Sequence, residues 1–173
     1  MTILRSKNFI LRLYKKGDEP SLVKHANNRT IAKNTLAMPY PYTMKDAKEW
    51  VEKNLKKYNK KDSDKFILAI EINGEVCGAI GLHHIEKEHK AEIGYWLGSE
   101  HWGKGIMTEA VRLMTSYGFK KLKLRRIYAH VFLFNEPSKR VLEKAGYELE
   151  GISRKEAKKK NKCLDAYLLA KVR

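Results

Sequence analysis

The stretch that decides the fold reads Glu92-Ile-Gly-Tyr-Trp-Leu97, then Gly98-Ser-Glu-His-Trp-Gly-Lys-Gly105, then Ile106-Met-Thr-Glu-Ala110. The first segment is a short apolar run, as in a strand, and the second is a polar turn rich in glycine. Apolar residues then recur at helical spacing, at Ile106, Ala110, Leu113, Met114 and Tyr117. A strand, a glycine-rich turn and a helix therefore follow one another.

The residues on either side extend this unit into a sheet. Residues 126–132 read as the next strand, and a strand, helix, strand order joins parallel neighbours by a right-handed crossover. Asn73-Gly74 between two apolar runs predicts a β-hairpin. The other expected elements are strands at 8–14, 88–97, 147–152 and 163–172, helices at 17–26 and 135–144, a helix capped by Thr43 with a basic tail at 56–61, and a basic turn at 155–162.

Length and composition place these elements in one domain. The chain has 173 residues, of which 43% are hydrophobic and 32% charged, as in soluble globular proteins. We expect a single α+β domain over residues 1–173, with a mixed, mostly antiparallel twisted sheet of about seven strands, one parallel crossover and about four helices.

The cellular location of the protein is predicted from sequence features that are absent. It has no run of about 18 apolar residues, and residues 1–7 lack the apolar stretch of a secretory signal. Cys77 and Cys163 have no CxxC partner, so they form neither a disulfide framework nor a thiolate metal site. We expect a cytoplasmic protein without a membrane span.

The charge is strongly positive. The 36 Lys and Arg exceed the 20 Asp and Glu, giving a net charge of +16. The surplus is spread over residues 56–57, 60–61, 120–126 and 158–162, which favours a solvated cationic surface over a dedicated nucleic-acid face. The phosphates of a cofactor or of a ribosome would both suit such a field.

The segment from Trp102 to Ala110 predicts an anion site. A helix N-terminus offers unpaired N–H groups and a partial positive charge, and glycines let the backbone approach an anion closely. The segment is not a Walker A loop, and it is not a dinucleotide fingerprint because Thr108 stands where the third glycine should be. Phosphate binding is the natural use of the turn.

Together with Asn135-Glu-Pro-Ser138 and Glu143-Lys-Ala-Gly-Tyr-Glu-Leu-Glu-Gly151, these segments resemble the GNAT acetyltransferases. The closest likeness is to the RimJ/RimL-type branch, which acetylates protein N-termini. The resemblance covers nearly the whole chain, including Leu11-Arg-Leu13 and Pro39-Tyr-Pro-Tyr-Thr43. It implies the GNAT fold and acetyl-CoA as co-substrate.

The resemblance also implies the cofactor-binding residues. The strand residues Tyr95, Trp96 and Leu97 would pair their backbone with the pantetheine arm, and the turn would wrap the pyrophosphate through Trp102, Gly103, Lys104, Gly105, Ile106, Met107 and Thr108. The family motif is usually Gln/Arg-x-x-Gly-x-Gly/Ala. The RimJ/RimL branch commonly has tryptophan at the first position, so Met107 at the last is the departure. Because main-chain N–H groups bind the anion, a larger side chain is tolerated if it points into the core.

Asn135 and Ser138 have two readings. Asn is a favoured N-cap and Pro137 fits a first helical turn, so both residues could simply begin a helix. The resemblance implies instead that Asn135 lies beside the pantetheine or acceptor and that Ser138 protonates the leaving thiolate. Many GNAT enzymes use a tyrosine four residues later as the acid, but Leu142 stands there, which excludes it.

For the base, the resemblance points to Glu92, with a surface salt bridge as the equal alternative and water as another proton acceptor. A one-residue shift in register would turn this side chain to the other face. A strong base is not essential for an α-amine, which is roughly 10% neutral at pH 7, whereas a lysine ε-amine is only about 0.04% neutral.

The sequence also contains histidines that could suggest a metal site and aromatic residues that could suggest an acceptor pocket. His83, His84, His89 and His101 lack a convincing ligand spacing, and adjacent strand residues point to opposite faces, so we expect no metal site among them. Tyr40, Tyr42 and Trp50 could line an acceptor pocket or pack in the core.

The predicted function is acetyl transfer from acetyl-CoA to a primary amine by direct attack. The expected acceptor is a protein N-terminal α-amine, with ribosome association, in a monomer or homodimer. A polyamine or aminoglycoside is the alternative acceptor, although a net charge of +16 repels polycations unless acidic residues focus the field locally. A non-catalytic ribosome- or RNA-binding module is the alternative from another class.

Overall fold

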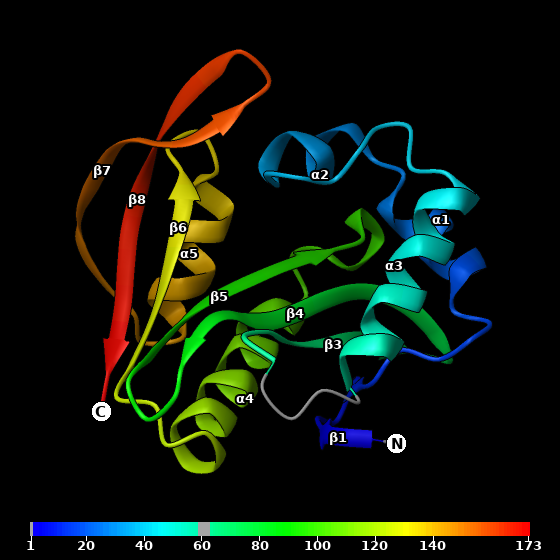
Figure 1. The fold of residues 1–173 in the computed structure, drawn as a ribbon, viewed down its shortest axis with the longest axis horizontal. Coiled ribbons are helices and arrows are strands. Elements are labelled where there is room, and N and C mark those ends of the chain that lie inside the picture. The colour runs from blue at the N-terminus through cyan, green and yellow to red at the C-terminus, as the bar shows by residue number, and fades with distance from the viewer. Residues whose placement is uncertain (1, 59–62) are drawn as a thin grey trace.

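The computed structural model describes residues 2–58 and 63–173, so Lys60 and Lys61 of the basic tail lie outside the described residues. It has a mixed sheet with helices on both faces (Figure 1). The strands are β1 (Thr2–Arg5), β2 (Ile10–Arg12), β3 (Phe66–Ile72), β4 (Glu75–Glu86), β5 (Lys90–Leu97), β6 (Arg126–Phe132), β7 (Glu148–Lys159) and β8 (Lys162–Val172). The helices are α1 (Glu19–Ala26), α2 (Arg29–Asn34), α3 (Met44–Tyr58), α4 (Ile106–Lys121) and α5 (Glu136–Lys144), with a 3-10 turn, η1 (Ser99–His101).

The sheet splits in its middle. Its strand order is β1-β2-β3-β4-β5-β6-β8-β7, and within the described residues β5 and β6 form its only parallel pair. They pair only from Lys90 with Arg126 to Glu92 with Tyr128. Beyond Glu92, β5 continues along β4 and β6 continues along β8, so the two halves of the sheet diverge. The divergence exposes backbone edges of both strands.

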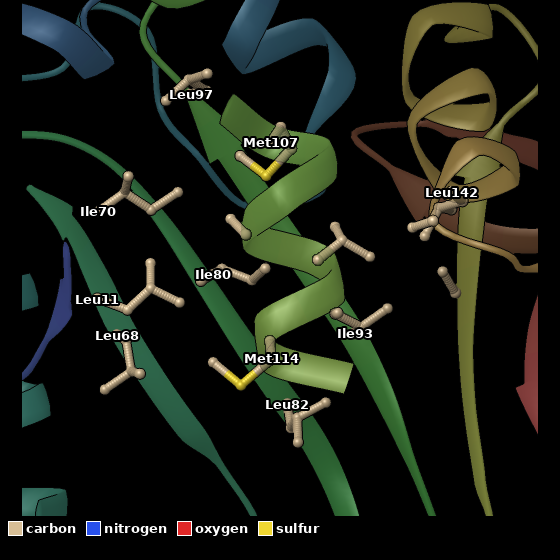
Figure 2. Close-up of a cluster of buried hydrophobic side chains, with 14 of the residues drawn as sticks. Leu11, Leu68, Ile70, Ile80, Leu82, Ile93, Leu97, Met107, Met114 and Leu142 are labelled. Atoms are coloured by element: carbon tan, nitrogen blue, oxygen red, sulfur yellow. The ribbon is translucent and has the colours of Figure 1, made fainter. Parts of the chain in front are cut away.

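Two clusters of buried side chains hold the helices on opposite faces. The larger cluster packs α4 and α5 against the sheet, and Figure 2 shows Met114 of α4 beside Leu82 of β4. A Cβ at Gly118 would lie 2.8 Å from the terminal methyl group of Ile127, so any larger residue there would require this side chain to shift. The smaller cluster packs α1 and α3, with Leu22, Ala47 and Val51 against the other face. Each truncation of a fully buried Met or Leu in these clusters would cost about 2–5 kcal/mol.

Local sequence signals account for several boundaries. Asn73 and Gly74 both have positive φ, 51° and 84°, as a tight hairpin turn between β3 and β4 requires. Thr43 and Asp46 form a reciprocal cap at the start of α3, in which the Thr43 N–H donates to Asp46 Oδ2 at 2.7 Å. The predicted hairpin and the predicted cap are therefore confirmed.

The α+β prediction is confirmed, with differences in detail. The described residues form eight strands and five α-helices, because β1 and α2 add one of each to the expectation. The predicted basic turn at 155–162 is wrong: Lys159 pairs with Lys162, and only Lys160 and Asn161 make the turn. Charged side chains are accommodated in β7 because most of its residues are exposed. Within the described part of the chain, no helix is long and apolar enough to cross a membrane.

Candidate active site

A cavity of about 880 Å³ opens where β5 and β6 part. Its walls come from both strands, from the start of α5, from α3, from the segment after α2 and from β7. The predicted residues that line it are Glu92, Tyr95, Trp96, Asn135 and Ser138. The structure thus brings the predicted strand and the predicted helix start together at one site.

The side chains of β5 alternate between the two faces of the sheet. Tyr95 packs against the cluster beneath α4 and α5, and Leu97 belongs to that cluster. Trp96 packs against the opposite cluster, beneath α1 and α3. Beyond Glu92 the strand has β4 on one side and the cavity on the other. An extended chain in the cavity could therefore pair with this backbone as a further strand does.

The turn between β5 and α4 has the geometry of an anion site. Gly103 and Gly105 have φ of 73° and 74°, and a Cβ at either would meet nothing within 4 Å. Gly105 is the N-cap of α4 and has no side-chain cap hydrogen bond. Trp102 is 46% exposed, and its Nε1 donates to the Leu97 carbonyl at 2.7 Å, which ties the turn to the end of β5. The first N–H groups of α4 therefore point out of an open, uncapped turn.

Met107, which stands where the family motif usually has Gly or Ala, points away from this anion site. Met107 is 7% exposed and belongs to the buried cluster of α4, on the first helical turn in Figure 2. Ile106 beside it is buried to the same degree, while Lys104 is exposed and Thr108 is half-buried. Met107 therefore leaves the main-chain N–H groups unobstructed, as the sequence analysis required of it.

At the start of α5, Asn135 is the N-cap and its side chain accepts a long 3.4 Å hydrogen bond from the Ser138 N–H. Asn135 therefore has the predicted capping role and also lines the cavity. Ser138 Oγ lies 2.9 Å from the Tyr95 hydroxyl, which also donates to the Ser138 carbonyl at 3.1 Å. Burial raises the pKa of Tyr95, against the opposing effect of its bond to Ser138, so Tyr95 remains a proton donor. Sequence reasoning missed this pair because 43 residues separate its members.

Glu92 faces the same cavity and pairs with His130. His130 Nδ1 lies 2.9 Å from Glu92 Oε1, and His130 Nε2 lies 3.5 Å from Glu156 Oε1. Burial acts to raise the pKa of Glu92, but the His130 hydrogen bond and charge together bring it below its ordinary value. The bond to Glu92 raises the pKa of His130. Glu92 is thus both an ion-pair partner and a cavity residue, and neither His130 nor Glu156 was foreseen.

The histidines weighed for a metal in the sequence do not gather. His83 is half-buried, with a pKa lowered by burial to about 4, and its neighbour His84 is exposed. The ligand-type cluster found in the described residues consists of His25, Cys77 and His101, and that arrangement is not itself evidence of a metal. Of the aromatic residues weighed for the acceptor, Tyr42 and Trp50 line the cavity, whereas Tyr40 is 47% exposed and lies outside its lining.

The cavity carries both signs of charge. In the described part of the chain, its carboxylates are Asp46, Glu49, Glu92 and Glu156, and its lysines are Lys53, Lys57, Lys65 and Lys158. Carboxylates therefore gather here in a protein whose net charge is +16. A cationic amine would meet a less repulsive potential in the cavity than over the rest of the surface.

This geometry identifies the class of protein. Residues 8–148 match the family model described as an acetyltransferase (GNAT) domain, and the chain belongs to the GNAT acetyltransferase family. The predicted resemblance is thereby confirmed.

Several known proteins are similar to this chain. The uncharacterized N-acetyltransferase p20 of Bacillus licheniformis is 38% identical over 62% of this chain and 61% of its own length. The chain thus aligns with less than two thirds of that relative. The ribosomal-protein-serine acetyltransferase of Escherichia coli (strain K12) is 29% identical over 72% of this chain and 69% of its own length, which agrees with the predicted RimJ/RimL-type likeness.

Solved structures show the same fold. A GNAT-family acetyltransferase from Bacillus anthracis superposes with a TM-score of 0.84 at 26% identity, covering 99% of this chain and 98% of its own. Spermidine N-acetyltransferase from Vibrio cholerae, solved with CoA and spermine, superposes with a TM-score of 0.78 at 23% identity, covering 96% of each chain. At that identity the second likeness concerns the fold alone.

Proposed function

We propose that this protein transfers the acetyl group of acetyl-CoA to a primary amine, and that the acceptor is the α-amine of a protein N-terminus. One observation carries the proposal: the edge of β5 that faces the cavity beyond Glu92 leads directly, at the end of this strand, into the uncapped turn before α4. An extended arm that ends in phosphates matches a strand edge followed by a helix N-terminus. Membership of the GNAT family supports the same reaction.

The residues that would hold acetyl-CoA follow from these features. The backbone of Tyr95, Trp96 and Leu97 would bind the pantetheine arm. The N–H groups of the turn from Trp102 to Thr108 would bind the pyrophosphate, and Asn135 would lie beside the arm. Exposed Lys104 adds positive charge at the turn. The thioester supplies an acetyl group already activated for attack by an amine.

Two groups of side chains would manage the protons. The amine nitrogen forms a bond to the acetyl carbon, the carbon–sulfur bond breaks, one proton leaves nitrogen and one reaches sulfur. The Glu92–His130 pair would accept the first proton, directly or through water. Ser138 would donate the second, and the Tyr95 hydroxyl at 2.9 Å would hold Ser138 Oγ in position and return a proton to it.

The protonation of the acceptor amine and the net charge of the protein both favour an α-amine acceptor. An α-amine is already partly neutral at pH 7, so it needs little help from a base whose pKa is lowered as that of Glu92 is. A net charge of +16 would speed the encounter with an anionic assembly such as a ribosomal particle. A polyamine is the second candidate, because the cavity carboxylates could focus the field locally. The cytoplasm, as site of protein synthesis, fits the α-amine proposal.

The first experiment is isothermal titration with acetyl-CoA at fixed salt. Saturable binding supports an acetyltransferase, whereas no binding would support a ribosome- or RNA-binding module that kept only the fold. The second is a thiol-release assay with N-terminal peptides, lysine peptides, spermidine and aminoglycosides as acceptors.

We expect an acidic N-terminal peptide to give the highest kcat/KM, and this value should fall as salt shortens the Debye length from about 10 Å at 0.1 M to about 3 Å at 1 M. A tenfold or larger advantage for spermidine, about 1.4 kcal/mol, would replace the α-amine with a polyamine. Sedimentation in the same buffers distinguishes a monomer from a homodimer.

A further inference from the structure

Three side chains with metal-binding atoms meet beside the turn that precedes the proposed phosphate site. His25 lies in the last turn of α1, Cys77 lies in β4 and His101 ends η1, and their ligand atoms all lie within 4.8 Å of one another. A 2.7 Å hydrogen bond from the Gly98 N–H to the Cys77 carbonyl joins β4 to this turn. The three residues are far apart in sequence, so no local motif marks them.

The distance between His25 and Cys77 matches one edge of a coordination tetrahedron. Bonds of about 2.0–2.1 Å from zinc to nitrogen and about 2.3 Å to sulfur place the two ligand atoms roughly 3.5 Å apart. The distance from His25 Nε2 to Cys77 Sγ is 3.6 Å. The rings of His25 and His101 are tilted by 48° with centroids 5.6 Å apart, so their nitrogens can converge on one point. The existing positions therefore need only small adjustments around an ion.

A carboxylate lies beside His25 and would move in to complete the ligand set, because it is not among the three residues whose ligand atoms lie within 4.8 Å of one another. Glu75 Oε2 lies 2.9 Å from His25 Nε2, and Lys24 Nζ holds the same oxygen at 2.8 Å. An ion between these groups would take the place of the proton shared by His25 Nε2 and Glu75, and this proton passes to His25 Nδ1 or to solvent. It would also displace the proton of the Cys77 thiol, which passes to solvent. One thiolate and one carboxylate then balance the charge of a divalent ion.

Burial and access suit an ion of this kind. Cys77 and His25 are 1% and 5% exposed, so packing holds them in place, whereas the half-exposed His101 leaves a route from solvent. Sulfur and imidazole donors in a tetrahedral arrangement favour zinc over magnesium or calcium.

We propose that His25, Cys77, His101 and Glu75 bind one zinc-type transition-metal ion, which ties α1, β4 and η1 together beside the acetyl-CoA turn. The sequence predicts no metal site because no Cys or carboxylate completes a ligand spacing with the histidines, and His25, Cys77 and His101 are brought together only by the fold. The proposal does not depend on the acetyltransferase assignment, since its readouts require neither acetyl-CoA nor an acceptor.

The test is a cobalt titration of the whole chain after treatment with a chelator, in a non-thiol reductant. We expect visible bands of tetrahedral cobalt and a near-ultraviolet thiolate-to-cobalt band, both saturating at one equivalent and both abolished by zinc. Cys77→Ser should lose the thiolate band, and Cys163→Ser, which changes an exposed cysteine, should keep it.

His101→Gln provides a variant at a half-exposed position that should fold normally. It should bind cobalt roughly 10-fold or more weakly and should lose the zinc-induced rise in Tm, while His89→Gln at an exposed position keeps both. Circular dichroism checks the fold of each variant. Failure of the intact chain to give tetrahedral bands would overturn the proposal, as would a thiolate band that survives in folded Cys77→Ser. In either case His25, Cys77 and Glu75 form only a hydrogen-bonded network, with the ring of His101 packed beside it.

Discussion

Gly105→Ala isolates the anion-binding role of the turn before α4. Gly105 has φ of 74° and ψ of −1°, and an added Cβ meets nothing within 4 Å, so the cost to folding comes from the backbone alone. A left-handed conformation costs a non-glycine residue about 1–2 kcal/mol, which lowers Tm by about 2–8 °C for a domain of this size. Gly17→Ala is the matched control, because Gly17 has φ of 96°, is equally unobstructed and lies before α1, away in the sequence from the turn that begins α4.

The two variants should lose similar stability but differ in binding. In Gly105→Ala the methyl group occupies the space in which phosphate oxygens would approach the first N–H groups of α4, so the acetyl-CoA Kd should rise at least about tenfold, or about 1.4 kcal/mol. Gly17→Ala should bind with the affinity of the unmodified protein. Isothermal titration and thermal melts of the three proteins measure both quantities. An unchanged Kd in Gly105→Ala, with the Tm loss of the control, would refute the phosphate assignment.

Three further changes probe the cavity. Ser138→Ala should lower kcat by roughly 10- to 100-fold at unchanged acetyl-CoA affinity, and full turnover would mean that another group protonates the thiolate. His130→Gln should reduce stability more at about pH 5.5 than at about pH 8.5 in urea melts. The pKa of His130 is raised in the folded protein, so its contribution to stability is present at low pH and is lost as the pH rises. The pKa of Glu92 is lowered, so Glu92 stays ionised at both pH values. An equal loss of stability at the two pH values would contradict the ion pair. Lys159 donates to the carbonyls of Ala32, Lys33 and Thr35, and these bonds tie the β7–β8 hairpin to α2 and to the segment after it, part of which lines the cavity. Lys159→Met should cost about 1–2 kcal/mol by urea denaturation, unlike Lys162→Met at an exposed position, and equal effects would argue against the tie.

Elements with strong local signals were predictable from the sequence. The strand at 126–132 has the predicted bounds, and α5 begins one residue after the predicted 135 because Asn135 caps it. The short elements were not predictable. Strand β1 is a short strand at the sheet edge, and α2 has six residues with only Ile31 buried, so neither shows a periodic stripe. The C-terminal part of β7 was not predictable either, because its residues are mostly exposed and polar and therefore show no alternation of apolar and polar side chains.

The candidate site also has a part that local motifs predict and a part that they do not. The turn from Trp102 to Thr108 and Ser138 belong to continuous motifs, so they could be predicted from the sequence as candidate site residues. The contacts of Glu92 with His130, of Tyr95 with Ser138 and of Lys159 with α2 depend on sheet register and on helix placement. These contacts join residues 38 or more positions apart, and no spacing rule encodes them.

The order of strands gives part of the positive charge a protective role. Strands β1 and β7 lie at the two ends of the sheet, and an exposed strand edge can recruit another chain into an aggregate. Strand β1 has only four residues, and β7 carries Lys155, Lys158 and Lys159 and breaks register between Ser153 and Ala157. Repulsion between lysines and an irregular edge both oppose self-association. The basic residues of β7 would therefore keep the protein dispersed at the concentrations of a crowded cell, whatever the acceptor.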